Sequence, residues 1–214
     1  MVRMVLIRAL TYHIQPESKL KLKDAIDKLM ADSDSFKKIE KSSKVEIWTK
    51  RAVFPPLDFN QKDLLKISIS VEEALDDCGI DYAVIPLKKG DPKDLLELLP
   101  RSLSETSKVF FNVKAGDVKE DPSDFHLLPF ADLVRKIKEK AGSESCIRFA
   151  IAYGGPHETP YFPASTSIKG GVSACLRYAG SLEERILSSD ERSIEEILLS
   201  LFYPVTQDIR LACL

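Results

Sequence analysis

The sequence predicts a single α/β domain, residues 1–214, built on a mixed and mostly parallel sheet. Apolar segments of strand type alternate with segments whose apolar residues recur at helical spacing, nearly throughout the chain. A helix between two strands returns the chain to the same edge of the sheet, so that successive strands run parallel. With 214 residues, 44% of them hydrophobic, the chain is long enough to bury a sizeable core. It contains no internal repeat and no low-complexity linker, which favours one domain.

Two strand–helix pairs open the chain. A run of β-forming residues at 2–12 is followed by helical spacing of apolar residues over 18–41. The alternating segment 44–54 predicts the next strand, and a second helical stripe covers 60–78. Gly79 is a suitable residue to end that helix because glycine adopts the left-handed conformation without strain.

Two further pairs follow in the same order. The short apolar run 80–87 is typical of a buried strand, and the helix after it begins at Pro92, where the missing N–H costs nothing. We expect this helix to end at Pro100, because proline interrupts the hydrogen-bond ladder of a helix. Residues 108–116 form the next predicted strand, and 123–140 the next predicted helix.

The last third of the chain departs from the strand–helix alternation. The predicted strands 145–154 and 171–180 are joined by a segment without helical periodicity, so we expect this pair to be antiparallel and the sheet to be mixed. The remainder is predicted to be helical with a break at Pro204. Because the segment 203–214 is apolar, it is expected either to pack against a partner or to mark a chain that lacks a C-terminal half.

Composition narrows the class of protein. The formal net charge of −2 offers no electrostatic reason to expect nucleic acid or an anionic membrane as partner. No apolar run has the length of a membrane span, and the first residues lack the cleavage region of a signal peptide, so a cytoplasmic protein is predicted. Few Asn and Gln beside many Lys and Glu is the compositional bias of thermophilic organisms.

The cysteines predict neither a metal site nor a redox pair. They are widely spaced, with no CxxC motif: Cys78, Cys146, Cys175 and Cys213. Small thiol side chains in apolar segments are most often buried as hydrophobes, and we expect burial here.

The most unusual segment lies between the last two predicted strands and reads AYGGPHETPYFPASTSIKGG (152–171). His157 beside Glu158 is a candidate for acid–base chemistry. Backbone amides, hydroxyls and one ammonium in this stretch could bind a phosphate or carboxylate, although a structured loop without chemistry is the alternative. The candidate ligand-binding residues of this stretch are Gly154, Gly155, Ser165, Thr166, Lys169, Gly170 and Gly171.

Three residues on other segments complete the predicted site. Ligands of parallel α/β sheets bind beyond the carboxyl ends of the strands, where loops and helix N-termini gather. Arg51 at a strand end and Arg101 after Pro100 are candidate anion clamps, although an internal salt bridge explains either arginine equally well. Asn112 lies in the strand that approaches the same rim. His13, which follows the first strand, is predicted to be a surface or helix-entry residue.

Several segments together resemble a known family. These are LLPRSLSETSKVFFNVKAG, ADLVRKIKEKA, RFAIAYGGPHETPYFPAS, KGGVSACLRYAG, KVEIWTKRAVFPPL and GIDYAVIPL. Their order and spacing are similar to the N-terminal half of domain-of-unknown-function family 711, a "PFL family" of bacterial and archaeal cytosolic proteins. The resemblance implies half of a pyruvate formate-lyase-like α/β barrel and no assigned activity. The chain departs from the family pattern at Thr159-Pro160-Tyr161 and at Ser165-Thr166-Ser167, so a ligand of the family is not carried over to this stretch. Glycyl-radical chemistry is not supported either, because the sequence offers no radical-bearing glycine loop near the C-terminus and no cysteine at a loop tip.

Two functions are compatible with these observations. The first is binding of a small anionic metabolite at the rim formed by Arg51, Arg101, Asn112 and residues 154–171. The alternative is a non-catalytic homo-oligomer, structural or regulatory, whose apolar C-terminal segment forms the subunit interface. The sequence assigns no reaction and no cofactor.

Overall fold

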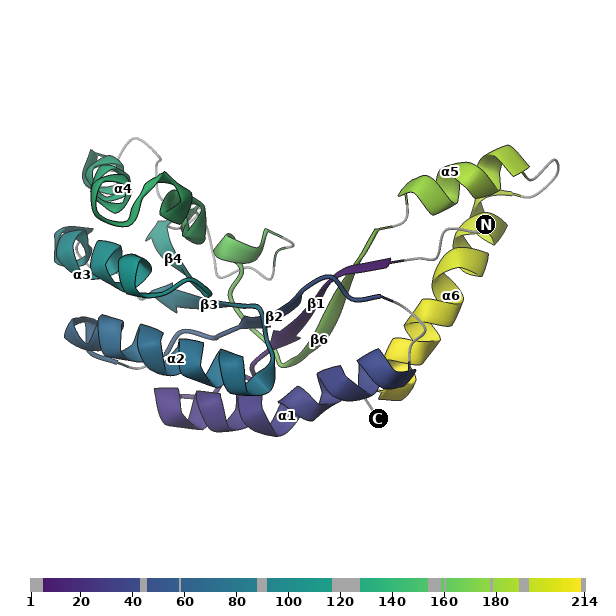
Figure 1. Ribbon diagram of the computed structural model, residues 1–214, viewed down its shortest axis with the longest axis horizontal. Helices are drawn as coiled ribbons and strands as arrows, with labels where there is room; N and C mark the ends of the chain where they lie inside the picture. The colour runs from purple at the N-terminus through teal and green to yellow at the C-terminus, as the bar shows by residue number, and fades with distance from the viewer. Residues whose placement is uncertain are drawn as a thin grey trace.

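The fold is an α/β sandwich of one sheet and one layer of helices (Figure 1). The computed structural model describes residues 6–42, 46–57, 59–87, 92–116, 128–153, 159, 161–177, 179–188 and 193–212. The six strands of the sheet are ordered β5-β4-β3-β2-β1-β6. The strands are β1 (Leu6–His13), β2 (Lys50–Val53), β3 (Tyr82–Leu87), β4 (Val109–Gly116), β5 (Phe149–Tyr153) and β6 (Gly171–Arg177).

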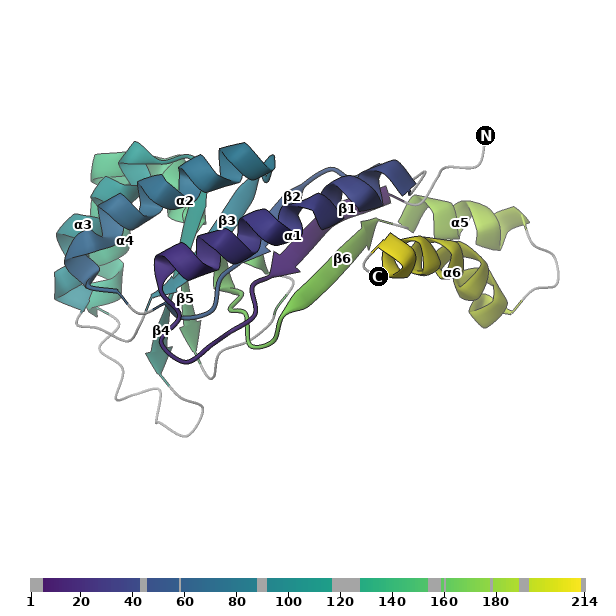
Figure 2. The ribbon, with the colours of Figure 1, turned by 90° about the horizontal axis from the view of Figure 1, so that it is seen from below.

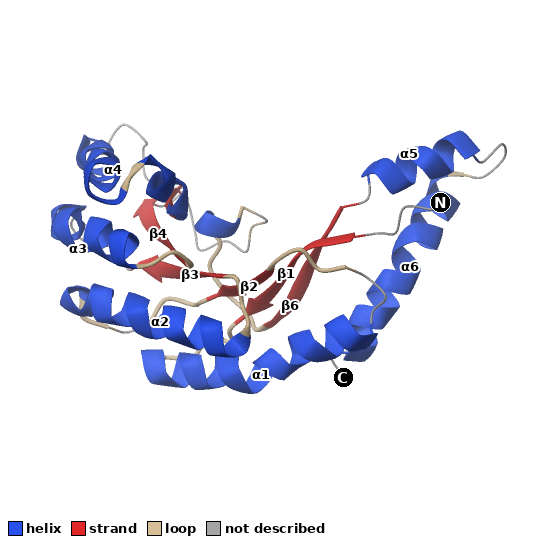
Figure 3. Ribbon diagram, viewed as in Figure 1, coloured by secondary structure: helices blue, strands red, loops and turns tan. Residues whose placement is uncertain are grey.

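Strands β1 to β5 are parallel, and each lies beside the one that precedes it in the chain. Right-handed crossovers that always step in the same direction place every connecting helix on the same face of the sheet. Figures 2 and 3 show helices α1 to α4 gathered on that face. The helices are α1 (Leu22–Ser42), α2 (Leu64–Cys78), α3 (Pro92–Glu105), α4 (Leu128–Ala141), α5 (Ala179–Ser188) and α6 (Ile194–Ala212), with short 3-10 turns η1 (Gln61–Asp63), η3 (Ser143–Arg148) and η4 (Phe162–Ala164).

The sheet is mixed, as the sequence predicts, but the antiparallel strand joins the opposite edge. β6 pairs with β1, with Thr11 opposite Ser173, and does not pair with its neighbour in sequence, β5. The connecting segment crosses the sheet and is fastened on the way, because the Ser167 N–H donates to the Phe54 carbonyl at 3.1 Å. A connection without a helix can reach either edge, so local sequence does not reveal the partner of β6.

Two prolines lie inside helices, where the sequence predicts an end and a break. α3 continues past Pro100 to Glu105, and α6 continues past Pro204. Leu103 in the last turn of α3 is buried in the core, so packing offsets the hydrogen bond that Pro100 cannot donate. The prediction for Gly79 is confirmed, because it ends α2 in the left-handed conformation with φ of 66°.

The hydrophobic core fills the space between the helices and one face of the sheet. Alternate side chains of β1, such as Leu10 and Tyr12, point into it. The other alternate set, which includes Thr11, points to the opposite face. Of the described elements, only the segment around η4 packs on that face (Figure 1). We call this side the open face, and it carries the candidate site.

Candidate functional site

The strand registers bring polar side chains together on the open face. Thr11 of β1 lies opposite Arg51 of β2 on one side and opposite Ser173 of β6 on the other. Facing residues of neighbouring strands project from the same side of a sheet, so these three side chains form a row. His13 begins the next row, two residues further along β1.

A cavity of about 680 Å³ lies over this row and is here called the Arg51 cavity. Its floor is the open face of β1, β2 and β6, and the segment containing η4 forms one wall. The lining residues are Arg8, Ala9, Thr11, His13, Arg51, Val53, Thr159, Tyr161, Phe162, Ser165, Ser173, Ala174 and Cys175. The described lining contains arginine, histidine and hydroxyl groups but no carboxylate.

Arg51 is the central cation of the cavity. Burial lowers the pKa of its guanidinium, and repulsion from Arg8 lowers it further. The Nε atom of Arg51 is buried and has no hydrogen-bond partner among the described residues. The guanidinium carbon lies 5.0 Å from the centre of the Phe162 ring, a cation–π contact that holds the side chain in place. Arg51 is thus fixed in position with hydrogen-bonding capacity left over.

The wall of the cavity is held by aromatic packing and by one amide. Phe162 packs on Val53 and Val84, and its ring meets Phe110 edge-on at 5.2 Å. The Asn112 amide donates to the Ser165 carbonyl at 2.8 Å. Through these contacts the wall is fixed to β2, β3 and β4, and the side chain of Ser165 reaches the cavity.

His13 forms a hydrogen-bonded pair with Ser173 across the β1–β6 edge. The Nε2 and Oγ atoms are 2.9 Å apart. His13 is buried, so its prediction as a surface residue is wrong, because β6 covers the edge of β1 on which it lies. An imidazole bonded to a hydroxyl can hold or pass on a proton at a bound ligand. The pair therefore adds an imidazole to a cavity whose other basic side chains, among the described lining residues, are Arg8 and Arg51.

A second cavity of about 510 Å³ continues from the first toward the amino ends of β1 and β2 and is here called the Trp48 cavity. Both cavities are lined by Arg8 and Cys175, so they share a wall. In the Trp48 cavity, the Arg177 guanidinium carbon lies 4.9 Å from the centre of the indole ring of Trp48. The other lining residues are Leu176 and Ala179, and this cavity too has no carboxylate among its described lining residues.

Arg148 shows how a structural arginine looks in the same protein. Burial also lowers the pKa of Arg148, but its guanidinium donates to the Thr106 carbonyl at 2.7 Å, to Ser145 Oγ at 3.0 Å and to the Leu103 carbonyl. These carbonyls belong to the C-terminal end of α3, where a cation is favourable. Its burial is therefore compensated within the protein, in contrast to that of Arg51.

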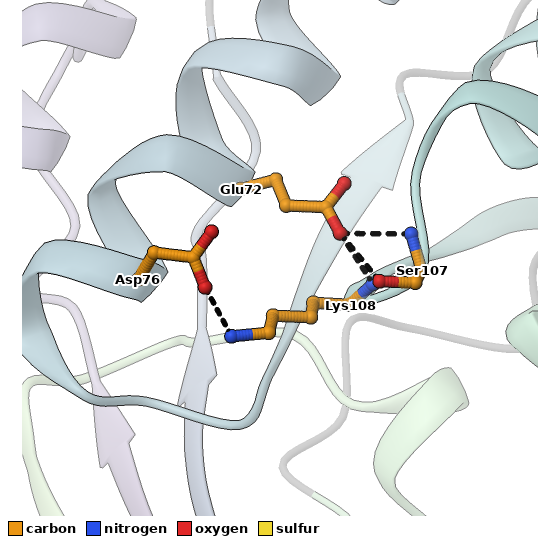
Figure 4. Close-up of polar contacts among 4 residues, drawn as sticks. All are labelled: Glu72, Asp76, Ser107 and Lys108. Carbon is orange, nitrogen blue, oxygen red and sulfur yellow. Dashed lines mark hydrogen bonds and ion pairs between the residues drawn. The ribbon is translucent and has the colours of Figure 1, made fainter.

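A second well-formed polar cluster is also structural (Figure 4). One carboxylate oxygen of Glu72 on α2 accepts from the Ser107 N–H at 2.8 Å, the Ser107 hydroxyl at 2.7 Å and the Lys108 N–H at 3.1 Å. Lys108 in turn forms an ion pair with Asp76. Every polar contact here is made within the chain, and the cluster fixes the entry into β4.

The structure brings together only part of the predicted site. Arg51 and Ser165 line the same cavity. Arg101 is exposed on α3, in the helical layer, and lines neither cavity. Asn112 is buried and acts on the backbone of Ser165. The predicted residues Gly154, Gly155, His157 and Glu158 lie outside the described residues.

The remaining predicted residues, Thr166, Lys169, Gly170 and Gly171, lie outside the lining of both cavities. Thr166 is buried and Lys169 is exposed. The Gly170 N–H donates to Gln15 Oε1 at 2.8 Å, and a side chain at Gly170 would collide with Gln15. Gly171 begins β6 with φ of 138°. The two glycines thus fit the close approach of this turn to the end of β1.

Sequence reasoning missed the residues that surround Arg51. Ala9, Thr11 and His13 alternate with core residues, which indicates that their side chains share one face of the strand. The alternation does not reveal that this face of the sheet is open. The prediction that the cysteines are buried is confirmed for Cys78 and wrong for Cys175, which is exposed. Cys175 belongs to an edge strand, and its side chain is on the open face.

Two further findings bear on the class of protein. Among the described residues, no three His, Cys, Asp or Glu side chains are grouped as metal ligands. None of the described helices combines the length and apolarity that crossing a membrane requires.

Fold and cavity together define an α/β protein with a singly wound sheet and a cationic cavity on its open face. The chain belongs to the family described as Uncharacterised ACR (DUF711), whose sequence model matches residues 3–195. The comparison with curated proteins returned no match.

Proposed function

We propose that the protein binds a small anionic metabolite in the Arg51 cavity. The observation that carries the proposal is the state of Arg51, a half-buried guanidinium whose Nε has no partner among the described residues. A buried donor without a partner and a second cation nearby both disfavour the empty site, and an anion offsets both. Thr11 and Ser173 add hydroxyl groups in the same row.

The contrast with Arg148 supports a ligand role for Arg51. Both guanidiniums are half-buried and have a lowered pKa, but among the described residues only Arg148 finds carbonyls and a hydroxyl to which it donates. A structural arginine needs such partners. The proposed site is therefore the Arg51 cavity on the open face of the sheet and not the predicted rim, and Arg51 and Ser165 are the predicted residues that line it.

The test is thermal denaturation with inorganic phosphate and with succinate, against sodium chloride at matched ionic strength. We expect both anions to stabilise the wild type and the Arg101→Met variant, and to leave the Arg51→Met variant unshifted. Arg101 is the matched control because it is an exposed arginine outside both cavities. Equal shifts in Arg51→Met and wild type would contradict the proposal, as would no shift at all.

We propose as a second candidate a homo-oligomer formed through α5 and α6. The observation that favours it is a set of large apolar side chains that are more than 40% exposed on these helices. They are Ile186, Leu187, Ile194, Leu199 and Tyr203. Exposed apolar surface of this kind is typical of interaction sites.

Sedimentation velocity tests the second candidate. We expect the wild type to associate and the double variant Leu199→Glu, Tyr203→Glu to sediment as a monomer, because two charges cannot be buried in an apolar interface. Ile147→Glu, at an exposed apolar position outside α5 and α6, serves as the control and should still associate. A monomeric wild type at tens of micromolar protein refutes this candidate and leaves the anion site untouched.

A further inference from the structure

The open face holds two cavities that share a wall, and their chemistry differs. The Arg51 cavity offers guanidinium, imidazole and hydroxyl groups, whereas the Trp48 cavity offers an indole ring and the stacked guanidinium of Arg177. Arg8 and Cys175 line both. A ligand anchored in the first cavity can therefore extend into the second without leaving the groove.

The charge of the first cavity favours a dianionic group. Arg8 and Arg51 are close enough to depress the pKa of Arg51 through their repulsion. No carboxylate among the described residues lines the cavity. Asp81 lies outside it and accepts from the Lys50 N–H at 2.8 Å, and its attraction for Arg51 is smaller than the repulsion from Arg8. A phosphate monoester carries about −1.5 to −2 charges near pH 7 and accepts several hydrogen bonds, so it matches two guanidiniums better than a single carboxylate does.

The surface of the second cavity favours a planar ring. Trp48 is 48% exposed, and the guanidinium of Arg177 already lies over its ring. Indole and guanidinium planes both stack on flat conjugated groups. Ala179 adds a small apolar side chain to the lining.

The strand register gives the spacing between the two ends. Trp48 N–H donates to the Ile7 carbonyl at 2.9 Å, while Arg51 lies opposite Thr11. Four residues along β1 separate these levels, which is about 13 Å at ~3.3 Å per residue. Arg8 lies between the levels, so an anion held by both arginines leaves room for a spacer of several bonds before the ring.

We infer that the ligand of this groove is a phosphate monoester joined through a spacer to a planar ring, the arrangement found in a nucleoside monophosphate. This inference rests on the proposed anion site and extends it. The phosphate binds between Arg8 and Arg51, and the ring packs in the Trp48 cavity against Trp48 and Arg177.

Three probes separate the parts of the ligand: inorganic phosphate, adenosine, and adenosine monophosphate, all at constant ionic strength. Trp48 is the only tryptophan of the chain, so its emission on selective excitation reports on the second cavity alone. We expect adenosine monophosphate to bind about tenfold or more tightly than phosphate and to change the Trp48 emission, since stacking of one base commonly contributes that much.

Two variants test whether the gain in affinity of adenosine monophosphate over phosphate arises in the Trp48 cavity, and titration calorimetry measures the affinities. In Trp48→Leu the advantage of adenosine monophosphate over phosphate should shrink at least fivefold while phosphate affinity stays as in the wild type. Unchanged phosphate affinity also shows that this variant is folded. The Tyr203→Leu control, an exposed aromatic residue on α6, should keep the full advantage.

The outcomes separate the two proposals. If phosphate and adenosine monophosphate bind equally and the Trp48 emission is constant, the planar-ring inference is refuted and the anion site stands. If adenosine binds as tightly as its monophosphate, the charge argument is refuted. If none of the three probes binds, the proposed anion site and the inference built on it both fail.

Discussion

Replacing Arg51 by methionine should make the ligand-free protein more stable and should abolish its response to anions. Methionine keeps most of the aliphatic length of arginine and removes the charge. The Nε atom of Arg51 is buried without a partner among the described residues, and Arg8 repels the guanidinium. Replacing a residue that stabilises the fold lowers the free energy of unfolding of the protein. Replacing a residue that is positioned for a ligand raises it.

The magnitude follows from two opposed contributions. Relieving a buried donor that lacks a partner is worth about 1–3 kcal/mol. Losing the cation–π contact between the half-buried Arg51 and the buried Phe162 costs about 1 kcal/mol, between the values for exposed and for desolvated pairs. The net is a stabilisation of about 1 kcal/mol, which corresponds to roughly 2–4 °C in Tm for a domain of this size.

Thermal and urea denaturation of the wild type, Arg51→Met and Arg148→Met provide the assay. We expect Arg51→Met to unfold at a higher temperature than the wild type without phosphate, and Arg148→Met to unfold at a lower one because the carbonyls at the end of α3 lose their donors. At phosphate equal to one hundred times its Kd, the wild type gains about 2.7 kcal/mol and Arg51→Met gains nothing. The reasoning is refuted if Arg51→Met is less stable than the wild type without phosphate.

Three further perturbations have defined outcomes. Glu72→Ala should lower the free energy of unfolding by about 2 kcal/mol, because one carboxylate oxygen of Glu72 accepts three hydrogen bonds. The control Glu73→Ala, at the exposed neighbouring position, should change it by less than about 0.5 kcal/mol. Urea titration measures both variants, and equal effects would contradict the structural role of Glu72. Hydrogen bonds from Lys136 and Lys140 lower the pKa of Glu97 from 4.5 to about 2, so its contribution to stability is present above pH 4.5 and is lost as the pH falls toward 2. Between pH 6 and pH 3 the urea midpoint should fall less for Glu97→Gln than for the wild type. This difference between the two proteins should vanish in molar salt, and its persistence there would argue against an exposed ion pair. Iodoacetamide should alkylate Cys175 far faster than Cys78, since burial raises the pKa of the Cys78 thiol, and saturating phosphate should slow the reaction at Cys175 only; peptide mapping that finds no protection at Cys175 contradicts the position of the anion.

Much of the fold can be predicted from local sequence patterns. Helical spacing of Leu64, Ile67 and Val71 marks the buried stripe of α2, and Gly79 ends that helix as its backbone freedom predicts. Patterns fail where packing outweighs propensity, as at Pro100, whose missing hydrogen bond is offset by burial of the last turn of α3. The type of each element is thus largely a local property, and some of its boundaries are not.

The candidate site could be predicted only in part. Arg51 is recognisable as a basic residue at a strand end, and Ser165 as a hydroxyl in an unusual loop. Arg101 has equal claim from sequence, yet it lies in the helical layer outside both cavities. Nothing local distinguishes the two arginines, because the difference lies in their places in the fold: Arg51 is on a strand beside the cavity, whereas Arg101 is exposed on α3.

The sequence by itself determines that helices and strands alternate, that the strands joined by helices run parallel, and that the last strand breaks this pattern. Only the tertiary structure decides that β6 joins the edge of β1 and that the helices share one face. Those two facts place Thr11, Arg51 and Ser173 in one row beside His13, although they are up to 162 residues apart in the chain. The physical reason is that periodicity records the burial of each segment, whereas strand neighbours are chosen by long-range pairing that no single segment encodes.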